Sequence, residues 1–428
     1  MLAENIELTP HAETERKASF FRQSGWLMIA NIAGGMLMWA VHFLANRIGP
    51  SQYGLFITLL TAVMLVPAIP LQMVFAQQTA RALATGSQRE LAGLLRFICL
   101  GTFAIWALLC IAVLLCQNTI LNFWGITDAV ALWITMPILL VTIWAPVFMG
   151  ILQGQQNFLW LGWSMMSGGI GRLGAAAVAV LILGQGAAGM MVGVLAGALL
   201  GLLIAVWQTR GIWLSPPQSF AWRGVLRQII PLLFGFIFVQ FLFTGDTLFV
   251  KHYFTGAATG AYGSAGTLSR ALIWLVGPLA TVMFPRIVHS SAKSEHTNIM
   301  GMVLLGTAVL SIGGAAGLAV LGRFVIALLW GKDFVMVAGP ILPWYALAMV
   351  PLALANVLVN NLLARSQFKI VPVTFLLSIA YAVTMVYVNQ NAGTLIRVLQ
   401  TLGVFNLLFL GACAWFTWAK KVRPSALA

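Results

Sequence analysis

An arginine in the middle of an apolar stretch is the clearest candidate for a ligand-binding residue. Arg172 lies among four glycine residues in the apolar run over 159–182, about 20 Å from the inner boundary of the membrane. A charge that faces lipid at this depth costs at least about 2.5–3.5 kcal/mol, so we predict that Arg172 faces a wet cavity. Its planar guanidinium group can hold the oxygens of a phosphate. The alternative is a structural bond to backbone carbonyl groups of a neighbouring helix.

Asp246 and Arg270 form the second candidate group. Each lies close to the outer end of its apolar run, over 229–250 and 266–288, so their side chains are expected at similar depth on consecutive helices. We predict that they form an ion pair when the outer side of the protein is closed. The pair is either structural or part of an outer gate. Asp246 is also the only carboxylate well within an apolar run, which limits the options for proton or sodium coupling.

Several neutral polar side chains also lie within the apolar runs. Each can bond to sugar hydroxyl groups in a cavity, although hydrogen bonds between helices are the commoner role of such residues. The residues that we predict to line a cavity are Gln72, Gln240, Asn356 and Asn360. We expect His42, in contrast, to be satisfied by a neighbouring helix.

The sequence does not predict a metal centre or an enzyme active site. Its four cysteine residues lie in or beside apolar runs without Cys-x-x-Cys spacing. The outer loops, with Asp128 and the segment over 323–333, offer no pair of carboxylates for acid–base catalysis. A Gly-x-x-x-x-Gly-Lys-Ser/Thr loop is also missing from the sequence, which argues against ATP hydrolysis. We therefore expect no catalytic residues, no metal and no cofactor.

The composition places these residues in a membrane protein. Charged residues make up 7% of the 428 residues and apolar residues 61%, whereas soluble domains carry roughly 25% charged residues. In a soluble protein the net charge of +14 would suggest nucleic acid. Most cations, however, lie in short segments between apolar runs, as the positive-inside rule and contact with anionic lipid require. No nucleic-acid partner is expected.

Twelve apolar runs have the length of a membrane span. They lie at about 24–46, 54–79, 94–116, 129–151, 159–182, 186–207, 229–250, 266–288, 299–321, 340–363, 370–388 and 395–418. If the N-terminus is cytoplasmic, the cytoplasmic segments hold 16 Lys and Arg residues, against 6 on the opposite side. The first run is long enough to span the membrane and is predicted to be an uncleaved helix. Both termini are therefore expected in the cytoplasm.

The second half of the chain repeats features of the first. Tyr53 recurs as Tyr262 at an offset of 209, and Pro70 recurs as Pro278 at an offset of 208. Six spans in each half predict two halves related by an axis along the membrane normal, with a cavity between them. The predicted domains are a cytoplasmic tail (1–23), the N-terminal half (24–210), a cytoplasmic linker (211–228), the C-terminal half (229–418) and a second cytoplasmic tail (419–428).

The sequence resembles the polysaccharide-unit flippases of the multidrug/oligosaccharidyl-lipid/polysaccharide exporter superfamily. The motifs that carry the resemblance are Arg-x-Gly-Pro-x-x-Tyr-Gly at 47–54, Leu-Gln-Gly-Gln-Gln-Asn-Phe at 152–158, the stretch that begins Gly245-Asp246, Gly-Ala-Tyr-Gly at 260–263 and Phe-Pro-Arg at 284–286. They are spread across most of the chain and follow the family's order. Such proteins carry undecaprenyl-pyrophosphate-linked sugar units from the inner to the outer leaflet in O-antigen or exopolysaccharide assembly.

The resemblance implies an all-α integral membrane protein of about 12 spanning helices, V-shaped with a central cavity, in the cell inner membrane. It implies a flippase that works by alternating access on a lipid-linked oligosaccharide with an anionic pyrophosphate headgroup. We expect a monomer whose partners are the bilayer, this substrate and a polysaccharide polymerase or other assembly protein. Two alternatives stay open: an exporter of drugs or small cations from the same superfamily, and an integral glycan-assembly enzyme. A cation exporter needs membrane carboxylates, of which this chain offers one candidate.

Overall fold

The computed structural model describes residues 10–126, 128–220, 222–273, 299–364 and 368–418, and all regular structure there is helical. The N-terminal half contains α1 (Pro10–Ala40), η1 (Val41–Leu44), α2 (Ala45–Met64), α3 (Ala68–Thr85), α4 (Gln88–Leu115), α5 (Gln117–Phe123), α6 (Ala129–Gly154), α7 (Phe158–Ala177), η2 (Val178–Ile182), α8 (Ala187–Gln208) and α9 (Arg210–Trp213). The C-terminal half contains α10 (Trp222–Thr244), α11 (Asp246–Tyr253), a helix over 256–273, α13 (Ile299–Leu329), α14 (Lys332–Ala364), η3 (Phe368–Ile370), α15 (Val371–Ala392) and α16 (Leu395–Trp418).

Ten helical stretches of the described residues are long and apolar enough to cross a membrane. The stretch over 25–85 holds the first two predicted spans. The helix over 256–273 holds the described part of the eighth span, whose remainder lies outside the described residues. The prediction of an all-helical protein with about 12 spans is therefore confirmed.

Helix ends differ from the predicted span ends, because apolarity marks the width of the bilayer and not the length of the helix. α1 begins at Pro10, within the segment predicted as a tail, and α14 begins at Lys332, before the apolar run at 340. The predicted second span, over 54–79, is divided into α2 and α3 at Pro67. Proline has no backbone N–H group for the helical hydrogen bonds, which accounts for this break.

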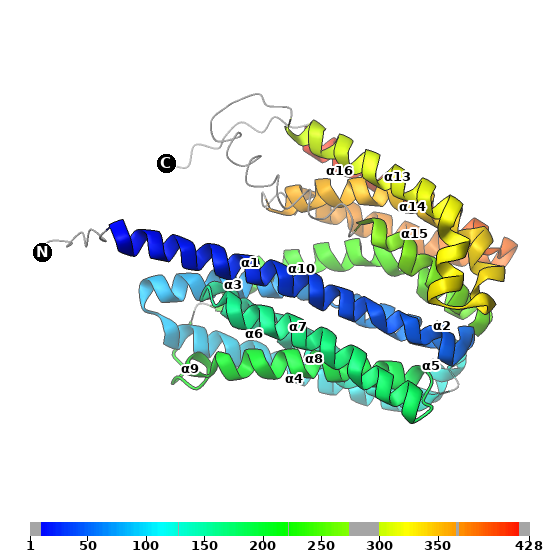
Figure 1. The fold of residues 1–428 in the computed structure, drawn as a ribbon. Coiled ribbons are helices and arrows are strands. Elements are labelled where there is room, and N and C mark those ends of the chain that lie inside the picture. Colours follow the sequence, from blue (N-terminus) through cyan, green and yellow to red (C-terminus); the bar gives the residue numbers. More distant parts are fainter. Residues whose placement is uncertain (1–9, 127, 221, 274–298, 365–367, 419–428) are drawn as a thin grey trace, which may run out of the picture.

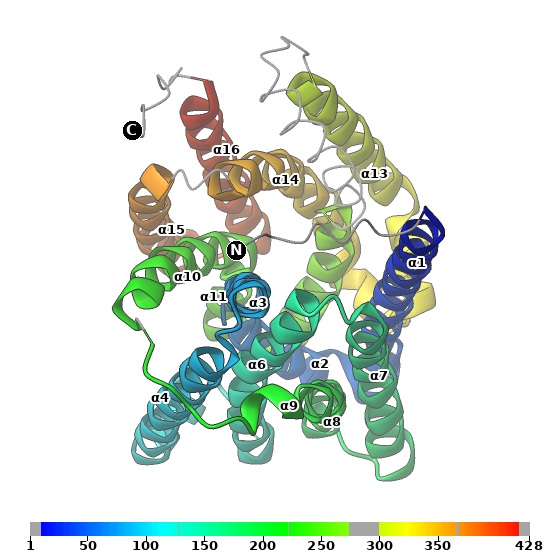
Figure 2. The ribbon, with the colours of Figure 1, turned by 90° about the vertical axis from the view of Figure 1, so that its left-hand side faces the viewer.

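The helices form two lobes that correspond to the two halves of the sequence. In Figure 1, α1 to α8 make up the lower lobe, and α10 and α13 to α16 the upper lobe. In the first lobe α7 packs against α1 and α8, and in the second α14 packs against α13 and α16. α1 begins and α16 ends at one end of the molecule, which we call the terminal end (Figures 1 and 2). The lobes diverge toward the terminal end and meet at the opposite end, which we call the junction.

The two copies of the sequence repeat face each other at the junction. A methyl group added to Gly54 would lie 2.5 Å from the carbonyl oxygen of Gly256, and one added to Gly260 would overlap the carbonyl group of Pro50. Gly49 has a φ of 76°, which a side chain would disfavour, and it sets the bend in α2 just before Pro50. The glycines of both motifs therefore allow the backbones of the two lobes to touch, as an axis between the repeats requires.

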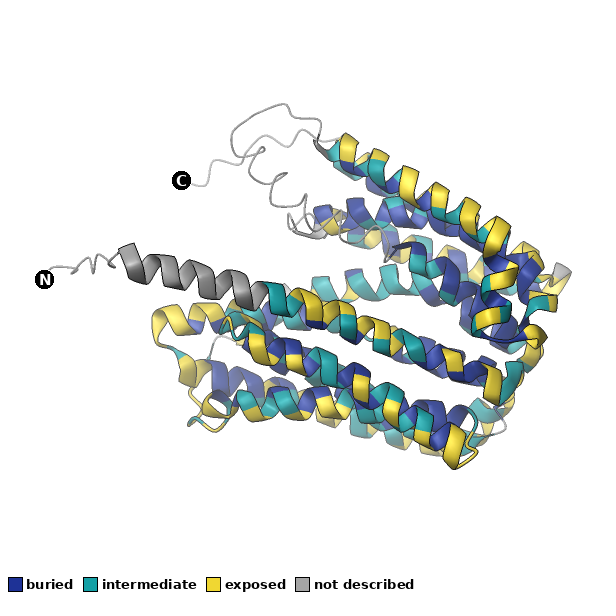
Figure 3. Ribbon diagram, in the orientation of Figure 1, coloured by how far each residue is buried: buried dark blue, intermediate teal, exposed yellow. Residues whose placement is uncertain are grey.

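Apolar side chains cover the outward faces of the helices. Figure 3 shows exposed residues along the outer side of α13, where Val320 and Phe324 are 81% and 68% exposed. On α4, Leu115 is 80% exposed. Keeping such side chains in water forgoes about 25 cal/mol per Å² of apolar area, so these faces are suited to lipid.

The first prediction tests the close approach at the junction. Gly260→Ala should weaken the contact between the lobes, because the added methyl group meets the backbone of Pro50 and not a side chain that can rotate away. Spin labels placed on the two lobes at the junction should report a longer mean distance in the variant by pulsed electron paramagnetic resonance. Gly313→Ala is the matched control, because nothing lies within 4 Å of a methyl group there. An unchanged distance distribution in Gly260→Ala would contradict the close approach.

Candidate functional site

The C-terminal lobe buries an ion pair near the junction. Asp246, at the start of α11, is 0% exposed, and its Oδ1 atom lies 2.7 Å from Nη2 of Arg270 in the helix over 256–273. The predicted ion pair is therefore confirmed. Asp246 is fully buried among neighbouring helices, and its expected place near the outer end of its span stays a prediction. A role of the pair as a gate stays a prediction.

Both partners of this pair have further hydrogen bonds. The Tyr262 hydroxyl group donates to Oδ2 of Asp246 at 2.8 Å, and the Tyr345 hydroxyl group donates to the same oxygen. Arg270 donates from Nε to the Phe243 carbonyl oxygen at 3.1 Å, and its guanidinium carbon lies 5.5 Å from the centre of the Tyr345 ring. A buried carboxylate needs such bonds to offset its lost hydration. Asp246 is thus fully engaged within its own lobe.

The N-terminal lobe holds a corresponding polar group on its side of the junction. Nδ1 of His42 and the hydroxyl group of Tyr53 are hydrogen-bonded at 2.8 Å, and both residues are buried. The prediction that His42 is satisfied by a neighbouring helix is confirmed. The Tyr53 hydroxyl group also lies 3.5 Å from Oγ1 of Thr267, which belongs to the other lobe. Tyr53 therefore contacts the other lobe, where its ring also packs 5.6 Å from that of Phe334 and 6.4 Å from that of Trp330.

Arg172 is close enough to the His42–Tyr53 pair to interact electrostatically with both residues. Its Nε atom is buried and has no hydrogen-bond partner among the described residues. The guanidinium group also lacks an ion pair in this part of the chain, where Arg270–Asp246 is the pair observed. The structural alternative, a bond to backbone carbonyl groups, is therefore not found among the described residues. Whether Arg172 binds a headgroup stays a prediction.

The glycines around Arg172 serve helix packing. A methyl group on Gly169 would lie 2.6 Å from the carbonyl oxygen of Gly34 in α1, and one on Gly171 would lie 3.1 Å from the Cα atom of Gly197 in α8. Gly174 has nothing within 4 Å. Close contact with α1 and α8 fixes the position of α7, and with it the position from which the Arg172 side chain extends.

The repeat relates the polar groups of the two lobes. Tyr53 corresponds to Tyr262 at an offset of 209 residues. The Tyr381 hydroxyl group is buried without a hydrogen-bond partner among the described residues, and its ring packs 5.9 Å from that of Phe241. Sequence analysis named Tyr262 as the repeat of Tyr53 but did not predict it as a site residue, and it did not single out Tyr345 or Tyr381. The repeat offset was the available signal for Tyr262, whereas Tyr345 and Tyr381 have no such marker.

The other predicted site residues lie outside these groups. Nε2 of Gln72 donates to Oε1 of Gln153 at 3.0 Å, which joins α3 to α6 within the first lobe. Nδ2 of Asn360 donates to Oδ1 of Asn356 at 3.1 Å, one turn earlier on α14. Gln240 is partly buried on α10. A role of these residues in binding sugar stays a prediction.

The motif over 152–158 forms the turn between α6 and α7. Gln156 has a φ of 56°, in the left-handed region, and the Asn157 side chain accepts a hydrogen bond from the backbone N–H group of Trp160 at the start of α7. Gly154 approaches the carbonyl oxygen of Ala76, at 2.5 Å from an added methyl group. These residues shape the backbone of the turn.

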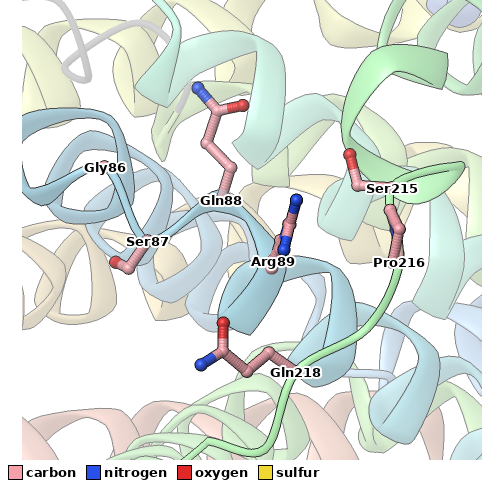
Figure 4. Close-up of a pocket in the computed structure, with 7 residues that line it drawn as sticks. All are labelled: Gly86, Ser87, Gln88, Arg89, Ser215, Pro216 and Gln218. Carbon is pink, nitrogen blue, oxygen red and sulfur yellow. The ribbon is translucent and has the colours of Figure 1, made fainter.

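A pocket of about 480 Å³ lies apart from the junction, where the turn between α3 and α4 meets the segment before α10. Figure 4 shows Gln88 and Arg89 from α4 and Gln218 from that segment around it. These three side chains are exposed, and Arg89 is the cation among the lining residues. The pocket contains no predicted site residue.

Comparison with known proteins finds a matching family and solved structures with a similar fold. A family model described as "Polysaccharide biosynthesis protein" matches residues 20–291. The inward-facing structure of a multidrug resistance MATE family transporter of the MOP superfamily is 12% identical, with 90% of this chain and 93% of that chain covered and a TM-score of 0.69. The lipid II flippase MurJ in its inward closed conformation is 15% identical, with 94% and 88% covered and a TM-score of 0.70. At these identities the likeness concerns the fold alone. A search of curated proteins finds no match.

The second prediction concerns the buried ion pair. Asp246→Asn should lower the stability of the folded protein by roughly 3–5 kcal/mol, because it leaves the Arg270 cation buried without its counter-charge. The midpoint of thermal unfolding in detergent measures this change. Asp333→Asn, on an exposed acid in the first turn of α14, is the control and should have a small effect. Asp246→Asn combined with Arg270→Gln should be no less stable than Asp246→Asn alone. Strictly additive losses would show that the two side chains do not depend on each other.

Proposed function

We propose that this chain, which belongs to the polysaccharide biosynthesis protein family, translocates lipid-linked oligosaccharide repeat units across the cell inner membrane by alternating access. The substrate class is an undecaprenyl-pyrophosphate-linked unit for O-antigen or exopolysaccharide assembly, as the sequence resemblance implies. The observation that carries this proposal is the partly buried Arg172 side chain, whose buried Nε atom has no hydrogen-bond partner among the described residues.

An unpaired cation in this position favours an anionic ligand. Arginine is a donor only, and its planar fork matches the oxygens of phosphate groups. Membrane-embedded charges are expensive to keep unless they have a function or a partner. A diphosphate headgroup supplies the missing acceptors, while its lipid tail stays in the bilayer that the apolar outer faces contact.

The exporter of drugs or small cations is the second candidate, since the fold is shared with a MATE transporter. Recognition of a cation needs a carboxylate that is free to receive it. Asp246 already accepts bonds from Arg270, Tyr262 and Tyr345. This engagement favours the anionic substrate over the cationic one.

The proposed orientation puts the terminal end in the cytoplasm. The Lys and Arg distribution supports this direction. A headgroup would then enter between the lobes from the cytoplasmic side, reach Arg172 at the junction, and leave when the lobes part there. The same orientation makes the junction the outer closure of the protein.

The third prediction tests the headgroup role of Arg172. Arg172→Ala should lower transport per folded molecule at least about tenfold, since a hydrogen bond to a charged group contributes roughly 1.5–3 kcal/mol. Arg172→Lys should recover part of the activity, because it keeps the charge and loses the bidentate fork. Complementation of a flippase-deficient strain, normalised to folded membrane protein, measures the effect.

Arg397→Ala is the matched control, because Arg397 is exposed near the start of α16. It should transport at the wild-type rate. If Arg172→Ala transports normally per folded molecule, Arg172 has a structural role and the proposed headgroup contact is wrong. If Arg172→Ala is active only on cationic drugs, the exporter is the better assignment.

The fourth prediction concerns orientation. A green fluorescent protein fused after Trp418 should fluoresce, and alkaline phosphatase fused at the same place should be inactive, because both reporters would remain in the cytoplasm. Fusions in the segment between α13 and α14 should give the opposite pattern. An active phosphatase at the C-terminal position would reverse the proposed direction of transport.

A further inference from the structure

A tryptophan of the C-terminal lobe is inserted into the polar group of the N-terminal lobe. Trp330 follows the last residue of α13, and its backbone N–H group bonds to the carbonyl oxygen of Ile326 at 2.9 Å. The side chain is 0% exposed. Its ring centre lies 5.9 Å from that of Trp39, 6.4 Å from that of His42 and 6.4 Å from that of Tyr53. Residues of the first lobe thus surround a side chain of the second.

The ring N–H group of Trp330 is buried without an acceptor among the described residues. The indole nitrogen is a donor only. The Tyr53 hydroxyl group lies close enough to interact with the Trp330 side chain, but this contact falls short of hydrogen-bond geometry, and the hydroxyl group is already engaged with His42 and Thr267. Most buried tryptophan N–H groups in proteins have a partner, and Trp26, Trp106, Trp133 and Trp144 of this chain each do. Trp330 therefore departs from the chain's own pattern.

A second buried donor without an acceptor lies beside the same His42–Tyr53 pair. This donor is Nε of Arg172, from the opposite lobe. Both unpaired groups are donors, and the carboxylate of Asp246 is held by its own lobe. Two unused N–H donors that flank one pair of side chains are complementary to oxygens of an anion.

We propose that Trp330 is a further ligand of the anionic headgroup, and that its ring N–H group and the Arg172 guanidinium group bind phosphate oxygens from opposite lobes. This inference rests on the proposed function for the identity of the substrate, but the anion site itself follows from the two donors. Because each lobe supplies one donor, the site is complete only when the lobes meet at the junction. Binding of the headgroup then favours the conformation that is closed there.

Trp330→Phe tests this inference on the full-length purified protein, because it removes the N–H group and keeps an aromatic ring. Inorganic pyrophosphate and undecaprenyl diphosphate are the two probes, and binding is followed by the shift of the thermal midpoint with ligand concentration. We expect Trp330→Phe to bind pyrophosphate about tenfold more weakly than wild type, as the loss of a bond to a charged group implies. Without ligand the variant should lose some stability, because the smaller ring leaves space in a fully buried cluster. The shift with ligand concentration is therefore measured against each protein's own midpoint without ligand.

Trp39→Phe is the matched control, since Trp39 packs edge-on against Trp330 in the same aromatic cluster. It should bind both probes as wild type does. A response to undecaprenyl diphosphate alone, weakened in Trp330→Phe, would support a site that needs the lipid-borne headgroup. Equal binding by wild type and Trp330→Phe, or no binding of either probe by wild type, would overturn the inference. Normal transport by Arg172→Ala together with Trp330-dependent pyrophosphate binding would refute the proposed function and leave the anion site.

Discussion

The fold depends on how a chain embedded in lipid handles the charges that it buries. Asp246 is stabilised by Arg270 and two tyrosine hydroxyl groups, all within the C-terminal lobe. Arg172, in contrast, has an unpaired buried Nε atom at the junction. Since leaving a buried charge unsatisfied is costly in either solvent, the two groups have different consequences. The Asp246–Arg270 pair stabilises the C-terminal lobe internally, whereas Nε of Arg172 has no hydrogen-bond partner among the described residues.

The internal repeat explains why these groups lie where they do. A twofold axis between the halves brings equivalent segments together, so the start of α2 packs against the start of the helix over 256–273. Tyr53 and Tyr262 then occupy equivalent places, with His42 and Asp246 as their respective hydrogen-bond partners. The same scaffold carries different chemistry in each half, because the repeated tyrosine bonds to a histidine in the first half and to a carboxylate in the second. The repeat places equivalent residues at equivalent positions in the two lobes, and differences in residue type make the two polar groups chemically different.

Sequence analysis predicted the helices from the length of the apolar runs and the two halves from the repeat offset. It predicted the Asp246–Arg270 pair from the similar depth of the two residues in consecutive spans. It misplaced helix ends such as Pro10 and Lys332. The apolar run is only as long as the bilayer is thick, whereas the helix continues beyond the bilayer. It did not find Trp330, whose importance comes from insertion into the other lobe. Contacts between segments about 280 residues apart, such as Tyr53 and Trp330, leave no periodic signal. Motifs at 47–54 and 152–158 pointed to the family, although their glycines mainly shape backbone contacts.

Most of the polar contacts between the two lobes are longer than those within the C-terminal lobe. Inside the C-terminal lobe the ion pair measures 2.7 Å and the bond from Tyr262 2.8 Å. Across the junction, Tyr53 and Thr267 are 3.5 Å apart, and Nζ of Lys251 lies 3.4 Å from the carbonyl oxygen of Gly125. His252 makes the shortest of these contacts between lobes, at 2.6 Å to the carbonyl oxygen of Phe123, and this side chain is not fully buried. Bonds that water can replace are broken at little net expense. The buried apolar cluster at the junction also includes residues of both lobes, with Trp330 packed against Trp39 and Tyr53. Parting of the lobes there therefore has to separate these apolar contacts as well.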